Sequence, residues 1–404
     1  MSTNQTDSKS WYRWVILAFA VSSFLMTFVS RFAWPSLVPV IAPVMNISMT
    51  EAMAYMTAFY IGYVIMQIPG GILADRFGPR LVLTLSLCVQ GLGTLGIGFI
   101  ESYAQGFALR VLCGLGAGCV FSSCLKAVVT WFPLEQRGFA VGLVMTAPAI
   151  GIAVPNFIMP VLNGFIGWQG AFRSVGILIL CFAAALAIFM RDRKNPAAGP
   201  RKSFLAGLKF VLSNRNTLVI AFLGFTTVWC QIGFGSVGNP YMTEILGLSV
   251  AGAGYMMMGY GLLGIPASAL TGYVSAGSIS KKKRMVIMSH CVLAALFFVF
   301  GRVGGFIPVL VTACLIGIFV ACVNALSSIL LADSAGPEWA ATAAGVGNCI
   351  FQIGALSSPL VIGIARDGAG HYAWTWWILG IGAIAGIFIV LLVKDRNIEV
   401  SAKK

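Results

Sequence analysis

The feature that most constrains this chain is the regular return of long apolar runs separated by short polar breaks. A helix needs about 20 largely apolar residues to cross a bilayer, and these runs have that length. Charged residues make up only 9% of the chain, against roughly a quarter in soluble domains. The sequence therefore predicts an all-α membrane protein of twelve transmembrane helices. The predicted spans are 14–41, 52–73, 81–100, 105–131, 138–162, 168–190, 218–242, 251–276, 284–301, 306–332, 340–363 and 374–393.

The basic residues predict how these spans are oriented. With a cytoplasmic N-terminus, twenty of the 26 Lys and Arg fall in inside segments, three fall outside and three lie within spans. This excess predicts that both termini are cytoplasmic, in a multi-pass protein of the cell (inner) membrane. The net charge of +14 is then a topology signal and not a sign of nucleic-acid binding. The first run is too long for a signal-peptide core, so we expect it to be retained.

The chain divides near its midpoint and repeats itself. The stretch 191–217 is polar and basic, which indicates a cytoplasmic linker between a six-helix bundle at 1–190 and another at 218–404. At an offset of roughly 203 residues, 133–142 matches 337–345, and 71–80 weakly matches 272–284. Duplicated halves of this kind predict two pseudosymmetric bundles with a binding site near the midplane.

Between spans two and three stands a glycine-rich, charged turn, Gly70-Gly71-Ile-Leu-Ala-Asp75-Arg76-Phe-Gly78-Pro-Arg80. It resembles the cytoplasmic signature G-x-L-x-D-r-x-G-r-[RK] of the major facilitator superfamily of secondary transporters. The glycines favour close helix approach, and Asp75 is placed to pair with a basic residue or a helix N-terminus. The resemblance implies a conformational latch made of Gly71, Asp75, Arg76, Gly78 and Arg80.

Span four carries a second pattern, Arg110-x-x-x-Gly114-x-Gly116-x-Gly118, which resembles the R-x-x-x-G-x-G pattern of the same superfamily. Arg110 lies toward the outer end of the span, where a long side chain can snorkel. For Arg110, Gly114 and Gly118 we therefore expect a gating or packing role.

Three of the Lys and Arg residues are assigned to span interiors: Arg31, Arg110 and Lys126. A charge at the centre of a spanning helix costs roughly 2.5–3.5 kcal/mol on an insertion scale, so a central one indicates function. All twelve Asp and Glu lie in loops, tails or span ends, and we expect no carboxylate to neutralise Arg31 or Lys126. An unpaired positive site favours an anionic ligand and disfavours lipophilic cations. The alternatives are a snorkelling Lys126 and an Arg31 bonded to backbone carbonyls.

Two segments resemble the anion:cation symporter branch of the superfamily, which carries sugar acids and other organic anions. One is Ser30-Arg31 in span one. The other is Lys126 followed by Trp131-Phe132-Pro133-x-x-x-Arg137-x-x-Ala140-x-Gly142. This resemblance implies that Arg31 and Lys126 contact the substrate anion. Many members carry Asp directly before the Arg, where this chain has Ser30. Proton coupling through that position is therefore in doubt, and anion exchange, uniport or another coupling group stay open. An Arg31 without neighbouring acids also resembles the oxalate/formate-type exchangers, which are the second family to which we compare the chain.

Further polar side chains in the spans are candidates for lining the cavity, with pairing to a neighbouring helix as the alternative. They are Tyr60, Gln67, Trp229, Gln231, Asn324, Asn348 and Gln352.

Several other classes of protein are disfavoured. The ten cysteines form no C-x-x-C pair and the two histidines are far apart, so no metal site and no cofactor are expected. Gly91-x-Gly93-x-x-Gly96 fits a nucleotide-binding pattern but lies inside a span. An exporter of neutral or cationic compounds is the main alternative function, followed by a membrane enzyme or receptor. The expected partners are a small anionic substrate, the bilayer, and a coupled proton or counter-anion. A monomer is the superfamily's usual form.

Overall fold

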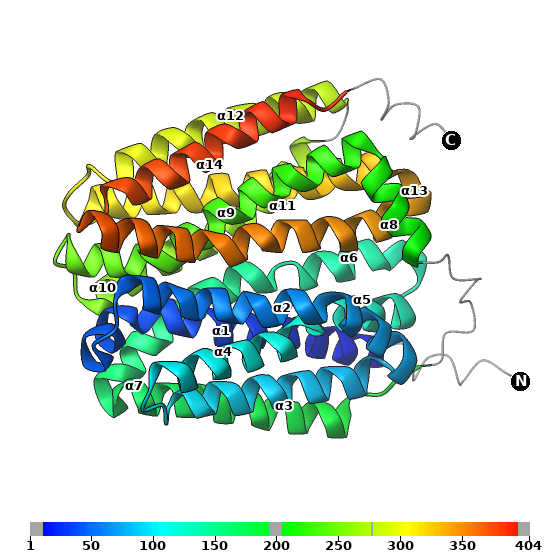
Figure 1. The fold of residues 1–404 in the computed structure, drawn as a ribbon. Helices are drawn as coiled ribbons and strands as arrows, with labels where there is room; N and C mark the ends of the chain where they lie inside the picture. The colour runs from blue at the N-terminus through cyan, green and yellow to red at the C-terminus, as the bar shows by residue number, and fades with distance from the viewer. Residues whose placement is uncertain (1–10, 194–203, 276–277, 395–404) are drawn as a thin grey trace, which may run out of the picture. The chain divides into compact units, whose positions relative to one another are not determined.

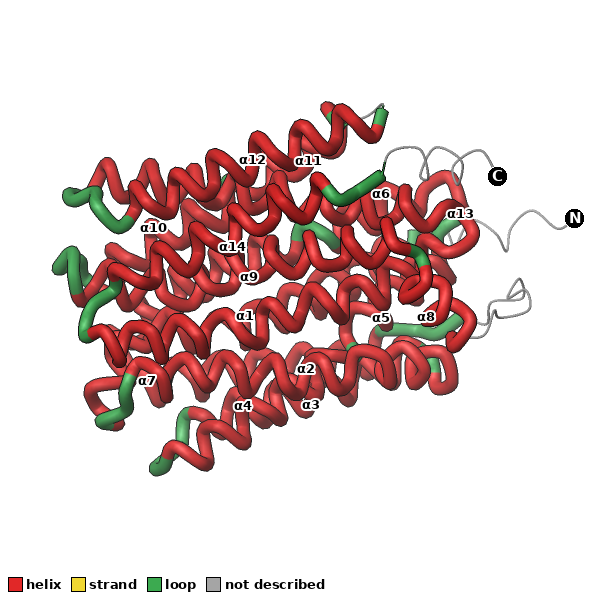
Figure 2. The backbone as a smooth tube through the Cα atoms, turned by 45° about the horizontal axis from the view of Figure 1, so that its top comes forward, coloured by secondary structure: helices red, strands yellow, loops and turns green. Residues whose placement is uncertain are grey.

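The computed structural model describes residues 11–193, 204–275 and 278–394, and within these ranges it contains helices and short connections but no strand (Figures 1 and 2). The helices are α1 Tyr12–Met45, α2 Met49–Phe77, α3 Pro79–Ile97, α4 Tyr103–Gly118, α5 Val120–Trp131, α6 Leu134–Val144, α7 Ala147–Phe189, α8 Phe204–Ser213, α9 Arg215–Glu244, α10 Val250–Leu262, α11 Gly264–Val274, α12 Ile279–Phe300, α13 Phe306–Ala369 and α14 Ala373–Leu391.

Ten helical stretches among the described residues are long and apolar enough to cross a membrane. One of them, Gln136–Phe189, holds two of the predicted spans, which meet at Gly167, where the backbone is left-handed (φ 70°). Another predicted span, 251–276, is divided between α10 and α11, each too short to count alone. With these two cases the helices account for the twelve predicted spans.

The structure divides the predicted span 251–276 into two helices, and the sequence supplies the reason. The helix breaks at Leu263, shortly before Pro266. Proline has no backbone N–H, so the bond that an unbroken helix would make to the carbonyl of Leu262 is missing. Span four breaks in a similar way at Cys119, directly after the helix-weakening Gly116 and Gly118.

Polar residues fix several helix starts. Before α2, the side chain of Ser48 accepts a hydrogen bond from the Glu51 backbone N–H (3.2 Å), and Glu51 accepts one from the Ser48 N–H (2.8 Å). This reciprocal pair is a capping box. Asn214 caps α9 by accepting from the Thr217 N–H at 3.2 Å. Such caps explain why these helices extend beyond the apolar runs from which the spans were predicted.

The chain forms two compact units. The first comprises Met1–Leu37 and Ala58–Gly199, and the second comprises Val38–Thr57 and Pro200–Lys404. Within the first unit α3 packs along α7 and against α4. Within the second, α9 packs against α13, and α12 lies beside α14 (Figure 1). Helices α1 and α2 each contribute one end to each unit.

Glycines allow α4 to approach α2 in the first unit. A Cβ added at Gly114 would lie 1.9 Å from the Phe59 carbonyl oxygen, and one at Gly118 would lie 2.5 Å from that of Tyr63. Contacts this short leave no room for any other residue, so the two backbones touch directly. Gly114 and Gly118 therefore hold the α2 segment that carries Phe59 and Tyr63 against α4.

We expect Gly114→Ala to separate α2 from α4 and to lower the free energy of unfolding by about 1–3 kcal/mol. Gly142→Ala is the matched control, because a Cβ at Gly142 has no atom within 4 Å and the residue is exposed in α6. Alanine there should be neutral or stabilise the helix by up to about 1 kcal/mol. Thermal unfolding of the purified variants in detergent measures both, and equal effects would contradict the close packing of α2 on α4.

Candidate functional site

Arg31 lies in the middle of α1 and is almost completely buried (2% exposed). Its guanidinium carbon lies 4.5–5.0 Å from the ring centroids of four aromatic side chains, Phe28, Phe59, Tyr60 and Tyr63. Aromatic ring faces attract a cation, by about 0.5–1 kcal/mol at exposed sites and 2 or more when desolvated. These rings therefore stabilise the charge of Arg31 without neutralising it.

The hydrogen-bonding capacity of Arg31 is largely unused. Its Nε and Nη2 atoms are buried and make no hydrogen bond of standard geometry to the described residues, and neither does the hydroxyl of Tyr60, which lies close to this guanidinium. No carboxylate in the described part of the chain forms an ion pair with Arg31. Leaving a charged donor buried and unsatisfied costs more than the 1–3 kcal/mol of a neutral one. Nε and Nη2 form the edge of a guanidinium that binds a carboxylate through two parallel bonds.

A second buried arginine holds the backbone that carries the first. Arg110 of α4 is fully buried, and its Nη1 and Nη2 donate to the carbonyls of Ser30 (3.1 Å) and Arg31 (3.2 Å). In an α-helix the Arg31 carbonyl would accept from residue 35, which is proline and has no N–H. Arg110 supplies the missing donor. Its contacts make it a positioning residue for Arg31, within the gating-or-packing role expected from the sequence.

Ser30 directly precedes Arg31, at the position considered above for proton coupling. Its hydroxyl is fully buried and hydrogen-bonds to the hydroxyl of Thr94 in α3, with 2.7 Å between the oxygens. Thr94 in turn lies 3.8 Å from the Cys113 sulfur. The side chains next to Arg31 on this side are therefore neutral. Thr94 carries no signal in the sequence that would mark it as part of this site.

Lys126 differs from the expectation. Its Nζ lies 2.9 Å from Oδ1 of Asp75 and donates to the Ala74 carbonyl at 2.7 Å. The expectation that no carboxylate neutralises Lys126 is therefore wrong. Asp75 lies near the end of α2, and its carboxylate contacts Lys126 of α5. Because Lys126 has this partner and Arg31 has none, the two cations are not equivalent.

The rest of the signature turn is built around α3. The Asp192 side chain accepts from the Arg80 backbone N–H at 3.0 Å and so caps this helix from the far end of α7. Gly78, with φ 87°, leaves space for that carboxylate, since a Cβ would lie 2.5 Å from it. The Arg80 side chain donates from Nε to the Ala187 carbonyl at 3.1 Å. The close approach expected at Gly71 occurs at Gly70, whose Cβ would lie 2.5 Å from the Cys119 Cα.

The second unit gathers several of the predicted polar residues. Asn324 of α13 donates from Nδ2 to Oε1 of Gln231 in α9 at 3.4 Å, and Gln352 donates to Asn348 one turn earlier at 3.3 Å. The indole of Trp229 packs against α14, where a Cβ at Gly382 would lie 2.7 Å from it. In the first unit the Oε1 of Gln67 is buried without a partner among the described residues.

The second unit also holds an ion pair that resembles the Asp75–Lys126 pair with its charges exchanged. Nζ of Lys282, at the start of α12, lies 2.6 Å from Oδ2 of Asp333 in α13. In both units the pair joins the turn after the second span of the half to the fourth span. The sequence comparison of 71–80 with 272–284 found the basic run but missed its acidic partner, because Asp333 lies on the other segment.

Comparison with known proteins identifies the family. The sequence profile of the Major Facilitator Superfamily matches residues 19–359 and 239–404. The chain belongs to this superfamily. The fold agrees: a bacterial homolog of the human lysosomal transporter Spinster, solved in an inward-facing and unoccupied conformation, superposes with a TM-score of 0.79 over 97% of both chains at 13% identity.

Similar proteins carry names that specify organic anions. The "probable sulfoacetate transporter" of Cupriavidus necator is 25% identical over 96% of this chain and 96% of its own. The "probable galactarate/D-glucarate transporter" of Bacillus subtilis is 26% identical over 87% of this chain and 86% of its own. The "hexuronate transporter" of Bacillus subtilis is 21% identical over 94% of both.

We expect a double charge reversal to reveal the Asp75–Lys126 pair. Asp75→Lys alone and Lys126→Asp alone each place like charges together and should lower the unfolding temperature. The double variant should recover most of the loss, with a coupling of roughly 0.2–1 kcal/mol, because both side chains are partly exposed. Asp192→Lys combined with Lys126→Asp is the control and should show no recovery. Strict additivity of the Asp75 and Lys126 effects would argue against the pair.

Proposed function

We propose that the chain is a secondary transporter that moves a small organic anion across the cell (inner) membrane by alternating access. The substrate class is a carboxylate, a sugar acid or a sulfonate, the classes to which the names of the similar proteins point. In this proposal the protein works as a monomer with both termini in the cytoplasm. Its bundles are 1–190 and 218–404, joined by a cytoplasmic linker at 191–217.

The observation that carries the proposal is the unused bidentate edge of Arg31. Nε and Nη2 are buried without a partner among the described residues, while four aromatic rings hold the guanidinium in place. An incoming carboxylate or sulfonate would satisfy both donors and supply the missing negative charge. A neutral or cationic compound would leave them unsatisfied. The buried charge thus favours an anion over the substrates of a drug exporter.

The other polar residues receive different parts. Tyr60, whose hydroxyl is also buried and unsatisfied, and Gln67 would complete the anion site in the first unit. Within the second unit, Gln231, Asn324, Asn348 and Gln352 would line a polar cavity, because their amides exchange hydrogen bonds that a polar ligand can replace. Trp229 would act indirectly, through the packing of α9 on α14.

We assign Lys126 to the latch in place of direct substrate contact, because Asp75 already neutralises it. In this assignment the Asp75–Lys126 pair, together with Gly71, Arg76, Gly78 and Arg80, stabilises one conformation of the cytoplasmic side. Movement of α2 relative to α5 during transport would break the pair. Its partial exposure keeps its strength low enough to be broken in each cycle.

Exchange of one anion for another is the coupling mode that the neutral Ser30–Thr94 contact favours. A carboxylate beside Arg31 would bind a proton and couple its movement to that of the anion, and no such group stands there in the described chain. Proton symport would need a titratable group elsewhere or a protonated substrate.

We expect Arg31→Gln to abolish stabilisation by organic anions. In detergent, a ligand at 100 times its dissociation constant adds roughly 2.7 kcal/mol of stability, and thermal unfolding against carboxylates, sugar acids, sulfonates and cationic compounds measures it. Wild-type protein should respond to at least one organic anion. The variant should lose this response, because two charge-assisted hydrogen bonds disappear.

Arg173→Gln is the matched control for this experiment. Arg173 also stacks on an aromatic ring in the first unit, with 3.9 Å to the centroid of Phe99, and donates to the Gly98 carbonyl. The control should keep the full anion response. Stabilisation by cations or neutral compounds that is indifferent to Arg31 would refute the anion proposal and leave the fold untouched.

We expect Ser30→Asp to make anion binding depend on pH. The ionised Asp would compete with the substrate for Arg31, so binding favours the protonated form and the affinity for a sulfonate should rise as the pH falls. Wild type and the uncharged control Ser30→Asn should not show this rise. Binding isotherms over a pH series test the prediction, and an equal pH response in wild type would reveal another titrating group at the site.

A further inference from the structure

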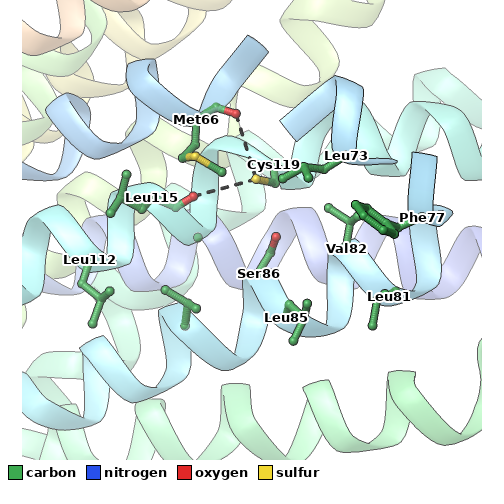
Figure 3. Close-up of a pocket in the computed structure, with 12 residues that line it drawn as sticks. Met66, Leu73, Phe77, Leu81, Val82, Leu85, Ser86, Leu112, Leu115 and Cys119 are labelled. Atoms are coloured by element: carbon green, nitrogen blue, oxygen red, sulfur yellow. Dashed lines mark hydrogen bonds between the residues drawn. The ribbon is translucent and has the colours of Figure 1, made fainter. Parts of the chain in front are cut away.

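A long apolar groove runs along the first unit on the outside of α2, α3 and α4, with a volume of about 470 Å³. Its floor consists of the small, buried residues Ser86, Gly116 and Cys119. Its walls consist of large side chains, among them Leu81, Leu85 and Leu112 (Figure 3). The volume lies within the roughly 300–1,000 Å³ typical of ligand pockets. The floor is narrow because α3 and α4 touch: a Cβ at Gly116 would lie 2.6 Å from the Ser86 carbonyl oxygen.

The groove is as long as one leaflet of a bilayer. Along α3 it is lined from Leu81 to Val89, which at about 1.5 Å per residue is roughly 12 Å. Half of a hydrocarbon core of about 30 Å is roughly 15 Å. Phe77 and Leu81 lie at one end of the groove and Leu112 at the other (Figure 3). The walls are exposed, with 47% of Leu81 and 56% of Leu85 accessible, so the groove opens outward from the bundle.

A positively charged side chain lies at one end of the groove. The guanidinium carbon of Arg76 is 5.3 Å from the ring centroid of Phe77, which lines that end. Arg76 is exposed and forms no ion pair with a carboxylate of the described residues. The neighbouring charges are already engaged: Asp75 with Lys126, and Arg80 with the Ala187 carbonyl. Arg76 is thus a cation without an ion-pair partner among the described residues, at the mouth of an apolar groove about as long as one leaflet.

We propose that this groove binds one acyl chain of an anionic phospholipid whose phosphate contacts Arg76. The apolar walls match the chain, and basic groups at the membrane surface attract anionic head groups. The positive-inside rule assigns the mouth to the cytoplasmic leaflet. This lipid site is separate from the Arg31 site and does not depend on the proposed substrate. The lipid would contact both α2 and α4. The end of α2 carries the latch residue Asp75, and the helix that follows α4 carries Lys126.

The test uses delipidated full-length protein in detergent with two probes that have the same oleoyl chains, phosphatidylglycerol and phosphatidylcholine. Native mass spectrometry should show one retained phosphatidylglycerol, and this lipid should raise the unfolding temperature more than phosphatidylcholine does. Arg76→Gln should weaken phosphatidylglycerol about fivefold and phosphatidylcholine less, because the cationic choline already offsets the charge of its phosphate. The control Arg302→Gln removes another exposed arginine, in the second unit, and should change neither lipid.

A second pair of variants tests the groove itself. Val89→Trp fills the groove and should abolish retention of both lipids. Leu92→Trp, on the same helix but not lining the groove and 55% exposed, should retain them. Equal binding of the two lipids to wild type would overturn the proposal, as would loss of binding in Leu92→Trp and Val89→Trp alike. Inorganic phosphate alone should not stabilise the protein, and stabilisation by phosphate equal to that by phosphatidylglycerol would reduce Arg76 to a site for free anions.

Discussion

The positive charge of Arg31, which forms no ion pair with a carboxylate of the described residues, organises the first unit. Arg31 sits among four aromatic rings that stabilise its charge and leave Nε and Nη2 free. The elements around it serve this arrangement. Gly114 and Gly118 bring α4 against the segment of α2 that carries the rings, and Arg110 fixes the backbone on either side of the charge. Without the Arg31 guanidinium, the centre of this aromatic pocket would hold no charge.

Each unit has an ion pair at the corresponding place, and the acid and the base are exchanged between the two pairs. In the first, an acid on the turn meets a base on the fourth span of the half, and in the second a base on the turn meets an acid. A pair keeps its attraction when both signs change, so duplicated halves are free to diverge in this way. The consequence is that a search for the same residues at the same repeat offset finds the turn but overlooks the partner, as happened with Asp333.

Much of the fold was predictable because lipid imposes a simple rule on every span. Apolar length alone placed the membrane-spanning helices but not α8, and the glycine-rich turn after α2 indicated the family. Helix breaks at Leu263 and Cys119 were not predicted, although Pro266 and Gly118 signal them locally. At the site, Arg31 was found because a charge inside a span is conspicuous. The partners of Lys126 and Ser30 were missed, because Asp75 and Thr94 lie on other helices and the sequence does not record which faces meet.

Pro35 makes the residue at position 110 depend on the residue at position 35. Because it leaves the Arg31 carbonyl without a helical donor, Arg110 has a bond to make there that an unbroken helix would not offer. Loss of Arg110 with Pro35 kept would leave the Arg31 carbonyl buried without this donor. Loss of Pro35 would restore a helical N–H at position 35, and the bond from Arg110 to the Arg31 carbonyl would no longer be needed. Substitutions at 35 and 110 should therefore be tolerated together more readily than singly, so that these two positions evolve as a pair although 75 residues separate them.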